Sequence, residues 1–167
     1  IHMTGEVEAG KALLRSGAQA GDTVFVTGTV GDAAAGLSLF ESCESDDHLV
    51  RRFLRPAARV EKGLELGGRA HAAIDISDGL VGDLRKLLDA SGVGAEIDLA
   101  RIPMSDALRA RFAEQDARGF ALTGGDDYEL CFTAPAAAVT GIDDITAIGT
   151  IVPGDQLICR HDGKVVE

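Results

Sequence analysis

Two clusters of acidic residues carry most of the chemistry that this chain can do. The first reads Asp75-Ile76-Ser77-Asp78-Gly79-Leu80, and the second, about fifty residues further on, reads Gly124-Gly125-Asp126-Asp127-Tyr128-Glu129-Leu130. Carboxylates crowded at the ends of apolar runs repel one another, and a hard divalent cation bound by their oxygens relieves that repulsion. If the fold brings the two clusters together, the chain carries part of a site for Mg²⁺ and phosphate.

The first cluster lies where a predicted strand, residues 72–76, meets a predicted helix. An apolar stripe with helical spacing follows the cluster: Leu80, Leu84, Leu87 and Leu88. On the strand, Asp75 points away from its apolar neighbours, and Asp78 is expected to begin the helix, so both carboxylates reach one cation. For Ser77 and Asp78 the alternative is a helix cap, and a nucleotide contact at a helix N-terminus uses the same geometry. Asp75 has no such capping role.

The second cluster follows a glycine pair and leads into a predicted strand. Adjacent residues on an extended segment face opposite sides, so Asp126 and Tyr128 share one side, and Asp127 and Glu129 share the other. The three acids therefore cannot all serve one site. The alternative is a solvated loop whose acids point to water.

The rest of the chain alternates between predicted strands and helices. Further strands are expected at 22–27, 95–99, 145–152 and 156–160, and further helices at 10–17, 33–40 and 105–112 and from Pro56 onward. This alternation, without an internal repeat, favours an α/β or α+β fold with helices packed on a layered mixed sheet. The length of 167 residues predicts a single domain, residues 1–167.

Composition and charge exclude several classes of partner. A formal net charge of −11 argues against nucleic acid or an anionic membrane. No stretch approaches the roughly eighteen consecutive apolar residues of a membrane span. The three cysteines form no CxxC pair, and their odd number gives no disulfide framework, which fits a reducing cytoplasm: Cys43, Cys131 and Cys159.

Other reactive residues give weaker signals. The sequence has no motif for a covalent nucleophile, and its four histidines lack metal-site spacing: His2, His48, His71 and His161. A basic group precedes the first acidic cluster: Arg51, Arg52, Arg55 and Arg59. Such a group is most often a solvated helix face, and its alternative role is to help hold an anion.

Five motifs recur together along the chain. They are Arg15-Ser-Gly-Ala-x-x-Gly-Asp22, Val26-Thr-Gly28 with Gly31-Asp-Ala-Ala-Ala-Gly-Leu37, Arg55-Pro-x-x-Arg-Val60, and the two acidic clusters. In this order, and over nearly the whole chain from about Gly5 on, they resemble the thiamine-monophosphate kinase family of the aminoimidazole-ribonucleotide-synthetase-like superfamily. The joint occurrence of the two acidic motifs is the most specific part of the resemblance.

The resemblance implies the C-terminal domain of such an enzyme. In the family, an N-terminal domain, absent from this chain, supplies further Mg²⁺ ligands and ATP contacts and mediates homodimerisation. By the same resemblance, Asp75 and Asp78 are Mg²⁺ ligands, Ser77 and Arg15 contact ATP, and Asp126 contacts thiamine monophosphate at a position where the family commonly has Glu.

The implied reaction transfers the γ-phosphoryl group of ATP to thiamine monophosphate and gives thiamine diphosphate. Such a transfer needs positioning and charge neutralisation rather than a protein nucleophile. We expect the isolated domain to be inactive because half of the site is missing.

Two alternatives stay open at this point. One is a related enzyme of the superfamily with another acceptor, similar to selenophosphate synthetase or to a hydrogenase-maturation dehydratase. The other is a non-catalytic binding module. The chain begins Ile1-His2-Met3, so we expect an excised piece of a longer protein or a cloning remnant.

Overall fold

The structure, a computed structural model, describes residues 4–44 and 46–166. Ile1-His2-Met3, on which the expectation of an excised piece depends, lies outside these ranges. In the described part of the chain, seven strands form one sheet: β1 (Thr23–Thr27), β2 (Ala72–Asp75), β3 (Gly94–Asp98), β4 (Leu130–Ala134), β5 (Ile145–Val152), β6 (Leu157–His161) and β7 (Lys164–Val166). The helices are α1 (Asp32–Glu41), α2 (Asp47–Leu54), α3 (Val60–Leu66), α4 (Leu80–Ser91), α5 (Asp106–Arg111) and α6 (Glu114–Thr123), with 3-10 turns η1 (Leu99–Arg101) and η2 (Ala136–Val139).

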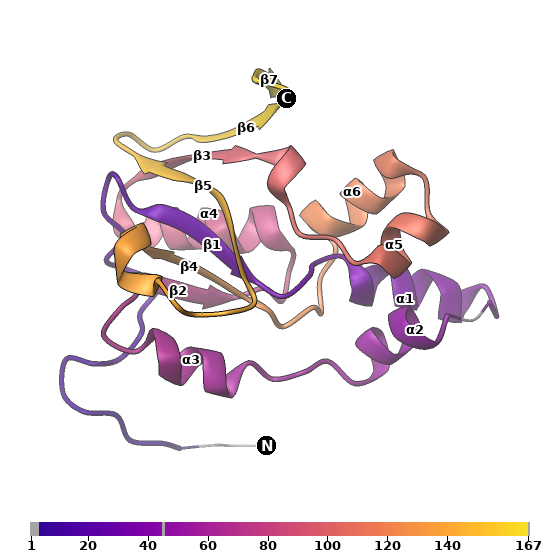
Figure 1. Ribbon diagram of the computed structural model, residues 1–167, viewed down its shortest axis with the longest axis horizontal. Helices are drawn as coiled ribbons and strands as arrows, with labels where there is room; N and C mark the ends of the chain where they lie inside the picture. Colours follow the sequence, from indigo (N-terminus) through magenta and orange to yellow (C-terminus); the bar gives the residue numbers. More distant parts are fainter. Residues whose placement is uncertain (1–3, 45, 167) are drawn as a thin grey trace.

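The strands lie in the order β2-β4-β1-β5-β3-β6-β7 (Figure 1). Only the β3–β6 pair is parallel among the pairs of this sheet, so the sheet is mixed. Helix α4 packs on one face, and α3 with η2 packs on the other. Helices α1, α2, α5 and α6 gather beside the sheet around their own apolar cluster (Figure 1). The predicted α/β architecture is confirmed.

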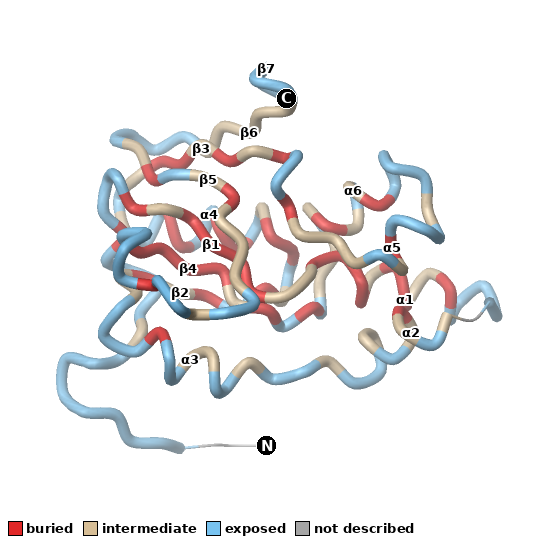
Figure 2. The backbone as a smooth tube through the Cα atoms, viewed as in Figure 1, coloured by how far each residue is buried: buried red, intermediate tan, exposed pale blue. Residues whose placement is uncertain are grey.

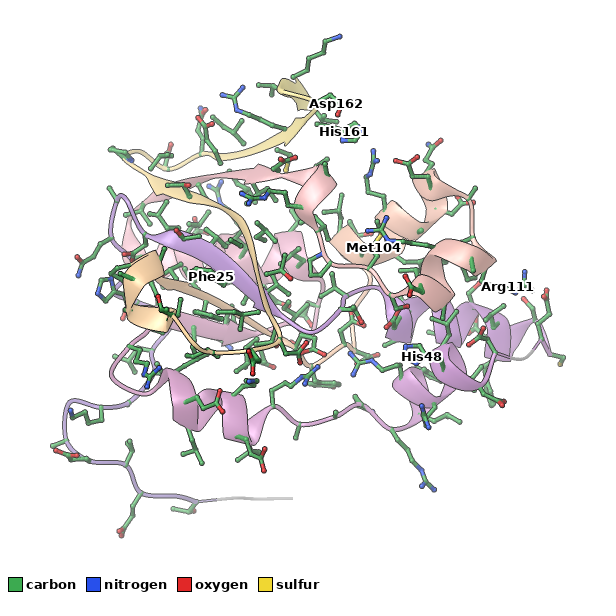
Figure 3. All side chains as sticks on the ribbon, in the orientation of Figure 1. Phe25, His48, Met104, Arg111, His161 and Asp162 are labelled. Atoms are coloured by element: carbon green, nitrogen blue, oxygen red, sulfur yellow. The ribbon has the colours of Figure 1, made fainter. Side chains whose placement is uncertain are left out.

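The core is built mainly from aliphatic side chains on the central strands and α4. Figure 2 shows buried residues along these elements and exposed residues along the N-terminal segment and much of α3. Phe25 on β1 stacks on Phe132 of β4, with ring centroids 5.1 Å apart, on the face that α3 covers (Figure 3). Among the described residues, no helix is both long enough and apolar enough to cross a membrane.

Residues 10–17, all within the described part of the chain, form no helix, so that prediction is wrong. Gly10 and Gly17 have positive φ angles of 79° and 121°. The carbonyl of Leu14 accepts the N–H of Ala73 on the edge strand β2 at 2.8 Å. The segment thus gives its backbone to the edge of the sheet, a tertiary contact that helical spacing does not reveal.

Three further helices differ from the prediction. The helix expected from Pro56 begins instead at Val60. Helix α2 was not predicted; it ends at Leu54, because the ring of Pro56 disfavours helical geometry at Arg55, whose φ is −145°. Helix α6 was not predicted at all. Its fully buried residues are the small Ala117 and Ala121, which leave no visible apolar stripe in the sequence.

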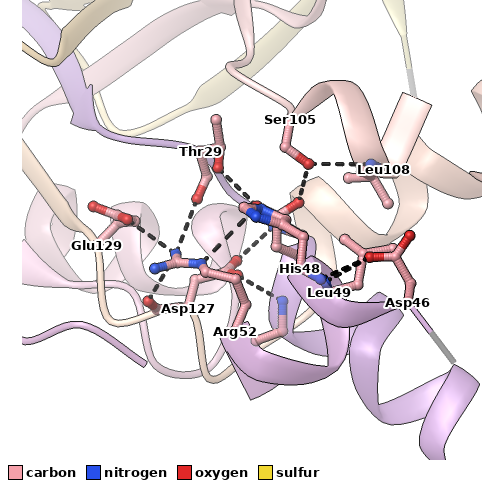
Figure 4. Close-up of polar contacts among 12 residues, drawn as sticks. Thr29, Asp46, His48, Leu49, Arg52, Ser105, Leu108, Asp127 and Glu129 are labelled. Carbon is pink, nitrogen blue, oxygen red and sulfur yellow. Dashed lines mark hydrogen bonds and ion pairs between the residues drawn. The ribbon is translucent and has the colours of Figure 1, made fainter. Parts of the chain in front are cut away.

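Three carboxylates of the described residues are fully buried where the sheet meets the helices: Asp32, Asp127 and Glu129. Glu129 accepts hydrogen bonds from Arg59 Nε at 2.6 Å and Nη2 at 2.7 Å, from Arg52 Nη2 at 3.0 Å and from Thr27 Oγ1 at 2.6 Å. Figure 4 shows the contact between Glu129 and Arg52. Arg52 and Arg59 therefore hold an internal carboxylate, and for these two residues the expectation of a solvated helix face is wrong.

The other two buried carboxylates fix helix ends. Asp127 accepts the N–H of Gly31 at 2.6 Å and the N–H of Ala33 at 3.1 Å, so it binds the first turn of α1. Burial raises the pKa of Asp127 to about 6, although these two N–H donors and Arg52 oppose the shift. Asp32 accepts Ser105 Oγ at 2.6 Å and lies 3.2 Å from His48 Nε2 (Figure 4). It thereby connects α1 to the first turns of α5 and α2.

We predict that Glu129→Gln lowers the free energy of unfolding by about 3–5 kcal/mol, because it removes the negative charge that two partly buried guanidinium groups share and turns one acceptor oxygen into a donor. Urea unfolding at constant m-value measures this change. The matched control is Asp89→Asn, which breaks the exposed Arg85–Asp89 pair and is expected to change stability by about 0.5 kcal/mol or less. A loss below about 1 kcal/mol in Glu129→Gln would show that the cluster is dispensable.

We predict that Asp127→Asn removes the part of the pH dependence of folding stability that Asp127 causes. A carboxylate whose folded pKa is raised binds more protons in the folded state, so its contribution to stability falls as the pH rises from about 4 to about 6. Relative to wild type, the variant should gain on the order of 2–3 kcal/mol between pH 4 and pH 7. Urea unfolding curves at both pH values test this. A variant whose stability relative to wild type falls between pH 4 and pH 7 would contradict it.

Candidate functional site

The fold brings the two acidic clusters together. Strands β2 and β4 pair as far as Asp75 and Leu130, and the backbone pairing continues past the strand ends. Ile76 N–H donates to the Glu129 carbonyl at 2.7 Å, Tyr128 N–H donates to the Ile76 carbonyl at 2.9 Å, and Asp126 N–H donates to the Ser77 carbonyl at 3.0 Å. The clusters form one surface at the end of these two strands.

Gly125 permits this close approach. A Cβ atom at residue 125 would lie 2.4 Å from the Ser77 carbonyl oxygen, so a larger residue would push the clusters apart. Asp126 and Tyr128 have positive φ angles of 67° and 52°. The backbone here is thus irregular, and β4 begins only at Leu130.

The predicted separation of the second cluster into two sides is confirmed. Asp127 and Glu129 are buried, whereas Asp126 and Tyr128 are exposed. A regular strand would give this separation, but residues 126–129 are not a regular strand. The two sides are set instead by the irregular backbone and by the partners of the two buried acids. Asp126 is therefore available to a ligand, and Asp127 and Glu129 are structural.

Three exposed carboxylates lie near enough to Tyr128 to act on its hydroxyl. We call these residues, together with the tyrosine, the acidic rim: Asp75, Asp78, Asp126 and Tyr128. The Tyr128 hydroxyl donates to Asp126 Oδ1 at 3.2 Å. This hydrogen bond, the charge of Asp126 and the charges of Asp75 and Asp78 raise the pKa of Tyr128. The rim thus concentrates negative charge from both clusters in one place.

Ser77 and Asp78 do not cap the helix that follows them. Helix α4 begins at Leu80, with Gly79 as its N-cap, and within the described residues no side chain caps that end. The expectation that Asp78 begins the helix is therefore wrong. The capping alternative for Ser77 and Asp78 is also removed.

A buried acid of α4 holds this loop instead. Asp83 Oδ2 accepts the N–H of Ser77 at 2.9 Å and the N–H of Asp78 at 2.8 Å. Our sequence reasoning missed Asp83, although a signal was present: it stands three residues after Leu80 and directly before Leu84, on the stripe that α4 buries. An acid on a buried stripe needs partners, and the loop supplies them.

Lys86 joins the same group from the next turn of α4. Its Nζ lies 2.5 Å from Asp78 Oδ2 and 2.8 Å from Asp83 Oδ1. The hydrogen bond and the charge of Lys86 lower the pKa of Asp78, to which Arg15 adds a smaller effect. Asp78 is held in its ionised form, as a cation ligand must be.

Arg15 lies exposed near the acidic rim. With Asp75, Arg59 and neighbouring residues it lines a hollow of about 330 Å³. A second, mostly apolar hollow of about 450 Å³ has Asp75 and Tyr128 in its wall. Asp75 thus borders both hollows, and the structure brings together all five residues that the sequence singled out: Arg15, Asp75, Ser77, Asp78 and Asp126.

The donors of the acidic rim suit a hard cation. Asp75 and Asp78 offer carboxylate oxygens, the ligands that Mg²⁺ prefers, and the Lys86 ammonium already lies as a positive group against Asp78. Among the described residues, no three His, Cys, Asp or Glu side chains gather as a metal-binding group. A cation here therefore needs further ligands from water, from a bound phosphate or from outside this chain. In Figure 3, His48 lies on α2 and His161 lies apart from it on β6.

Comparisons with known proteins agree with this geometry. The family model "AIR synthase related protein, C-terminal domain" matches residues 19–162. Thiamine-monophosphate kinase of Escherichia coli (strain K12) is 48% identical over 97% of this chain and 54% of that protein. The kinase of Aquifex aeolicus (strain VF5) is 38% identical over 100% of this chain and 56% of that protein. The chain spans about half the length of the curated relatives that it matches.

Solved structures give the same result. The crystal structure of thiamine-monophosphate kinase from Stenotrophomonas maltophilia K279a has a TM-score of 0.86 and 41% identity, over 96% of this chain and 56% of that one. AaThiL complexed with AMPPCP and TMP has a TM-score of 0.82 and 38% identity, over 93% of this chain and 52% of that one. Escherichia coli HypE, at 23% identity and a TM-score of 0.77, shares the fold alone. The chain therefore belongs to the AIR synthase related family, as a C-terminal domain that resembles thiamine-monophosphate kinases along its length.

Proposed function

We propose that this chain is the C-terminal domain of a thiamine-monophosphate kinase. In this proposal residues 1–167 are one domain, and an N-terminal domain of a longer protein supplies further metal and ATP contacts. The reaction transfers the γ-phosphoryl group of ATP to thiamine monophosphate and gives thiamine diphosphate. The observation that carries the proposal is the acidic rim, which both motif clusters form on a chain 38–48% identical to such kinases.

In this proposal the residues of the rim bind and orient the reactants. Asp75 and Asp78 are the Mg²⁺ ligands of this domain, and bound Mg²⁺ supplies the charge neutralisation that phosphoryl transfer requires. Ser77 and Arg15 contact ATP, and Asp126 contacts thiamine monophosphate. Asp83 acts through the loop, because it fixes the backbone of Ser77 and Asp78.

Tyr128 and the buried cluster have supporting roles. The Tyr128 hydroxyl orients the carboxylate of Asp126. Asp127 and Glu129, held from inside, keep Asp126 and Tyr128 on the outside. No covalent intermediate on a protein side chain is needed for this chemistry.

The alternatives have weaker support. Hydrogenase-maturation proteins share the fold at 15–23% identity, which carries no argument for their reaction. A non-catalytic binding module is less well supported, because the relatives that match nearly the whole chain, at 38% and 48% identity, are kinases. We further propose a cytoplasmic homodimer of the longer protein with neither nucleic acid nor a membrane as a partner, in keeping with the net charge of −11.

We predict that Asp75→Asn and Asp78→Asn, each introduced into the protein with its upstream half restored, lower kcat by about 100-fold or more, because transition-state charge loses its stabilisation. A coupled assay of ADP release measures this. The control is Asp89→Asn, which changes an exposed acid of α4 that pairs with Arg85. Activity within about twofold of wild type in both rim variants would refute the metal assignment.

We predict that the 167-residue chain alone shows no measurable kinase turnover. Calorimetric titration should give dissociation constants on the order of 1 mM for Mg²⁺-ATP and for thiamine monophosphate, since only part of each site is present. Turnover by this chain alone would contradict the proposed division of the site between two domains.

A further inference from the structure

The Lys86 ammonium lies between an exposed and a buried carboxylate. It is 2.5 Å from Asp78 Oδ2 and 2.8 Å from Asp83 Oδ1. Asp83 is 1% exposed, and its other oxygen already accepts two backbone N–H groups. Asp78 and Lys86 are 69% and 44% exposed, so this half of the arrangement faces solvent and is able to rearrange.

A divalent cation bound at Asp78 would use an oxygen of the carboxylate that Lys86 already contacts. A Mg²⁺ ion binds oxygen ligands at about 2.0–2.1 Å and would carry two positive charges next to the ammonium. Like charges so close together repel, so the ion and the ammonium compete for the Asp78 carboxylate.

Only one side of the Lys86 contact is fixed. Asp83 lies on α4 and accepts the loop N–H groups of Ser77 and Asp78, and these two hydrogen bonds do not involve Lys86. Asp78 has no comparable fixed position, and the positive groups that act on its carboxylate are Lys86 and, more weakly, Arg15. Lys86 can therefore release Asp78 and still keep Asp83 as its partner.

We propose that Lys86 is an internal stand-in for the divalent cation at Asp78: its ammonium neutralises Asp78 in the metal-free protein and is displaced when the cation binds. The inference rests on the proposed function, in which Asp78 is a metal ligand. Lys86 thereby limits repulsion within the acidic rim before substrate arrives, and it lowers the affinity of this carboxylate for metal.

The test measures Mn²⁺ binding to the 167-residue chain by the electron paramagnetic resonance signal of free Mn²⁺. Lys86→Met should bind Mn²⁺ about threefold to tenfold more tightly than wild type, because the competing ion pair is gone and such exposed pairs are weak. Asp78→Asn should bind more weakly than wild type. The matched control is Lys62→Met, which removes the same charge and breaks the Lys62–Glu65 pair on α3, and it should stay within about twofold of wild type.

The outcomes separate this inference from the proposed function. If Asp78→Asn weakens Mn²⁺ binding but Lys86→Met leaves it unchanged or weaker, the stand-in role is wrong and the metal assignment stands. If Asp78→Asn also leaves binding unchanged, both are wrong. Equal gains in Lys86→Met and Lys62→Met would assign the effect to net charge and overturn the inference.

A second measurement uses the wild-type protein and therefore needs no variant to fold. In wild-type protein, titration with Mg²⁺ should shift the side-chain ¹³Cε and ¹⁵Nζ resonances of Lys86 and leave those of Lys62 in place. Lys86→Gln, with thermal unfolding as a check of folding, repeats the Mn²⁺ measurement with a side chain of similar length. Lys86 resonances that do not move while Mn²⁺ binds at Asp78 would overturn the proposal.

Discussion

The position of the candidate site depends on one buried carboxylate, Glu129. Its two oxygens are shared among Arg59, Arg52 and Thr27, which come from three separate elements or segments. A charge without exposed surface is costly unless it is fully paired, so Glu129 fixes where these partners lie. The backbone on either side of Glu129 then has little freedom, and the neighbouring Tyr128 must face outward.

The acidic rim follows from this constraint. Asp127 binds the first turn of α1 from inside, and Asp126 is left outside next to the loop that Asp83 holds. Asp126 thus precedes the buried Asp127, and Asp78 lies in a loop whose backbone the buried Asp83 holds. The protein concentrates negative charge at one place, and Lys86 and Arg15 offset that charge from within the chain.

The sequence predicted the parts of the structure that depend on local pattern. Helix α4 was predicted because its leucines recur with helical spacing, and Asp75 and Asp78 were predicted as a cation pair because they lie where a strand meets that helix. Asp126 was singled out by the family resemblance. Helix α6 was missed because it buries alanines, and residues 10–17 were predicted wrongly because their backbone contacts β2. The pairing of Arg59 with Glu129 joins residues 70 positions apart, which no local pattern encodes. Asp83 was missed although its place on the buried stripe of α4 was a signal, and Lys86 was missed because only the loop geometry reveals its partners.

The central claim is that a cation binds at Asp75 and Asp78 of the first acidic cluster, on a surface that the second cluster shares. Paramagnetic broadening of backbone amide signals by Mn²⁺ tests it most directly, since broadening falls steeply with distance from the ion. The account predicts that low Mn²⁺ concentrations broaden the signals of residues 75–79 and 125–128 together and leave those of β6 and β7 sharp. Broadening confined to one cluster, or spread evenly over exposed acids such as Asp89 and Asp116, would contradict it.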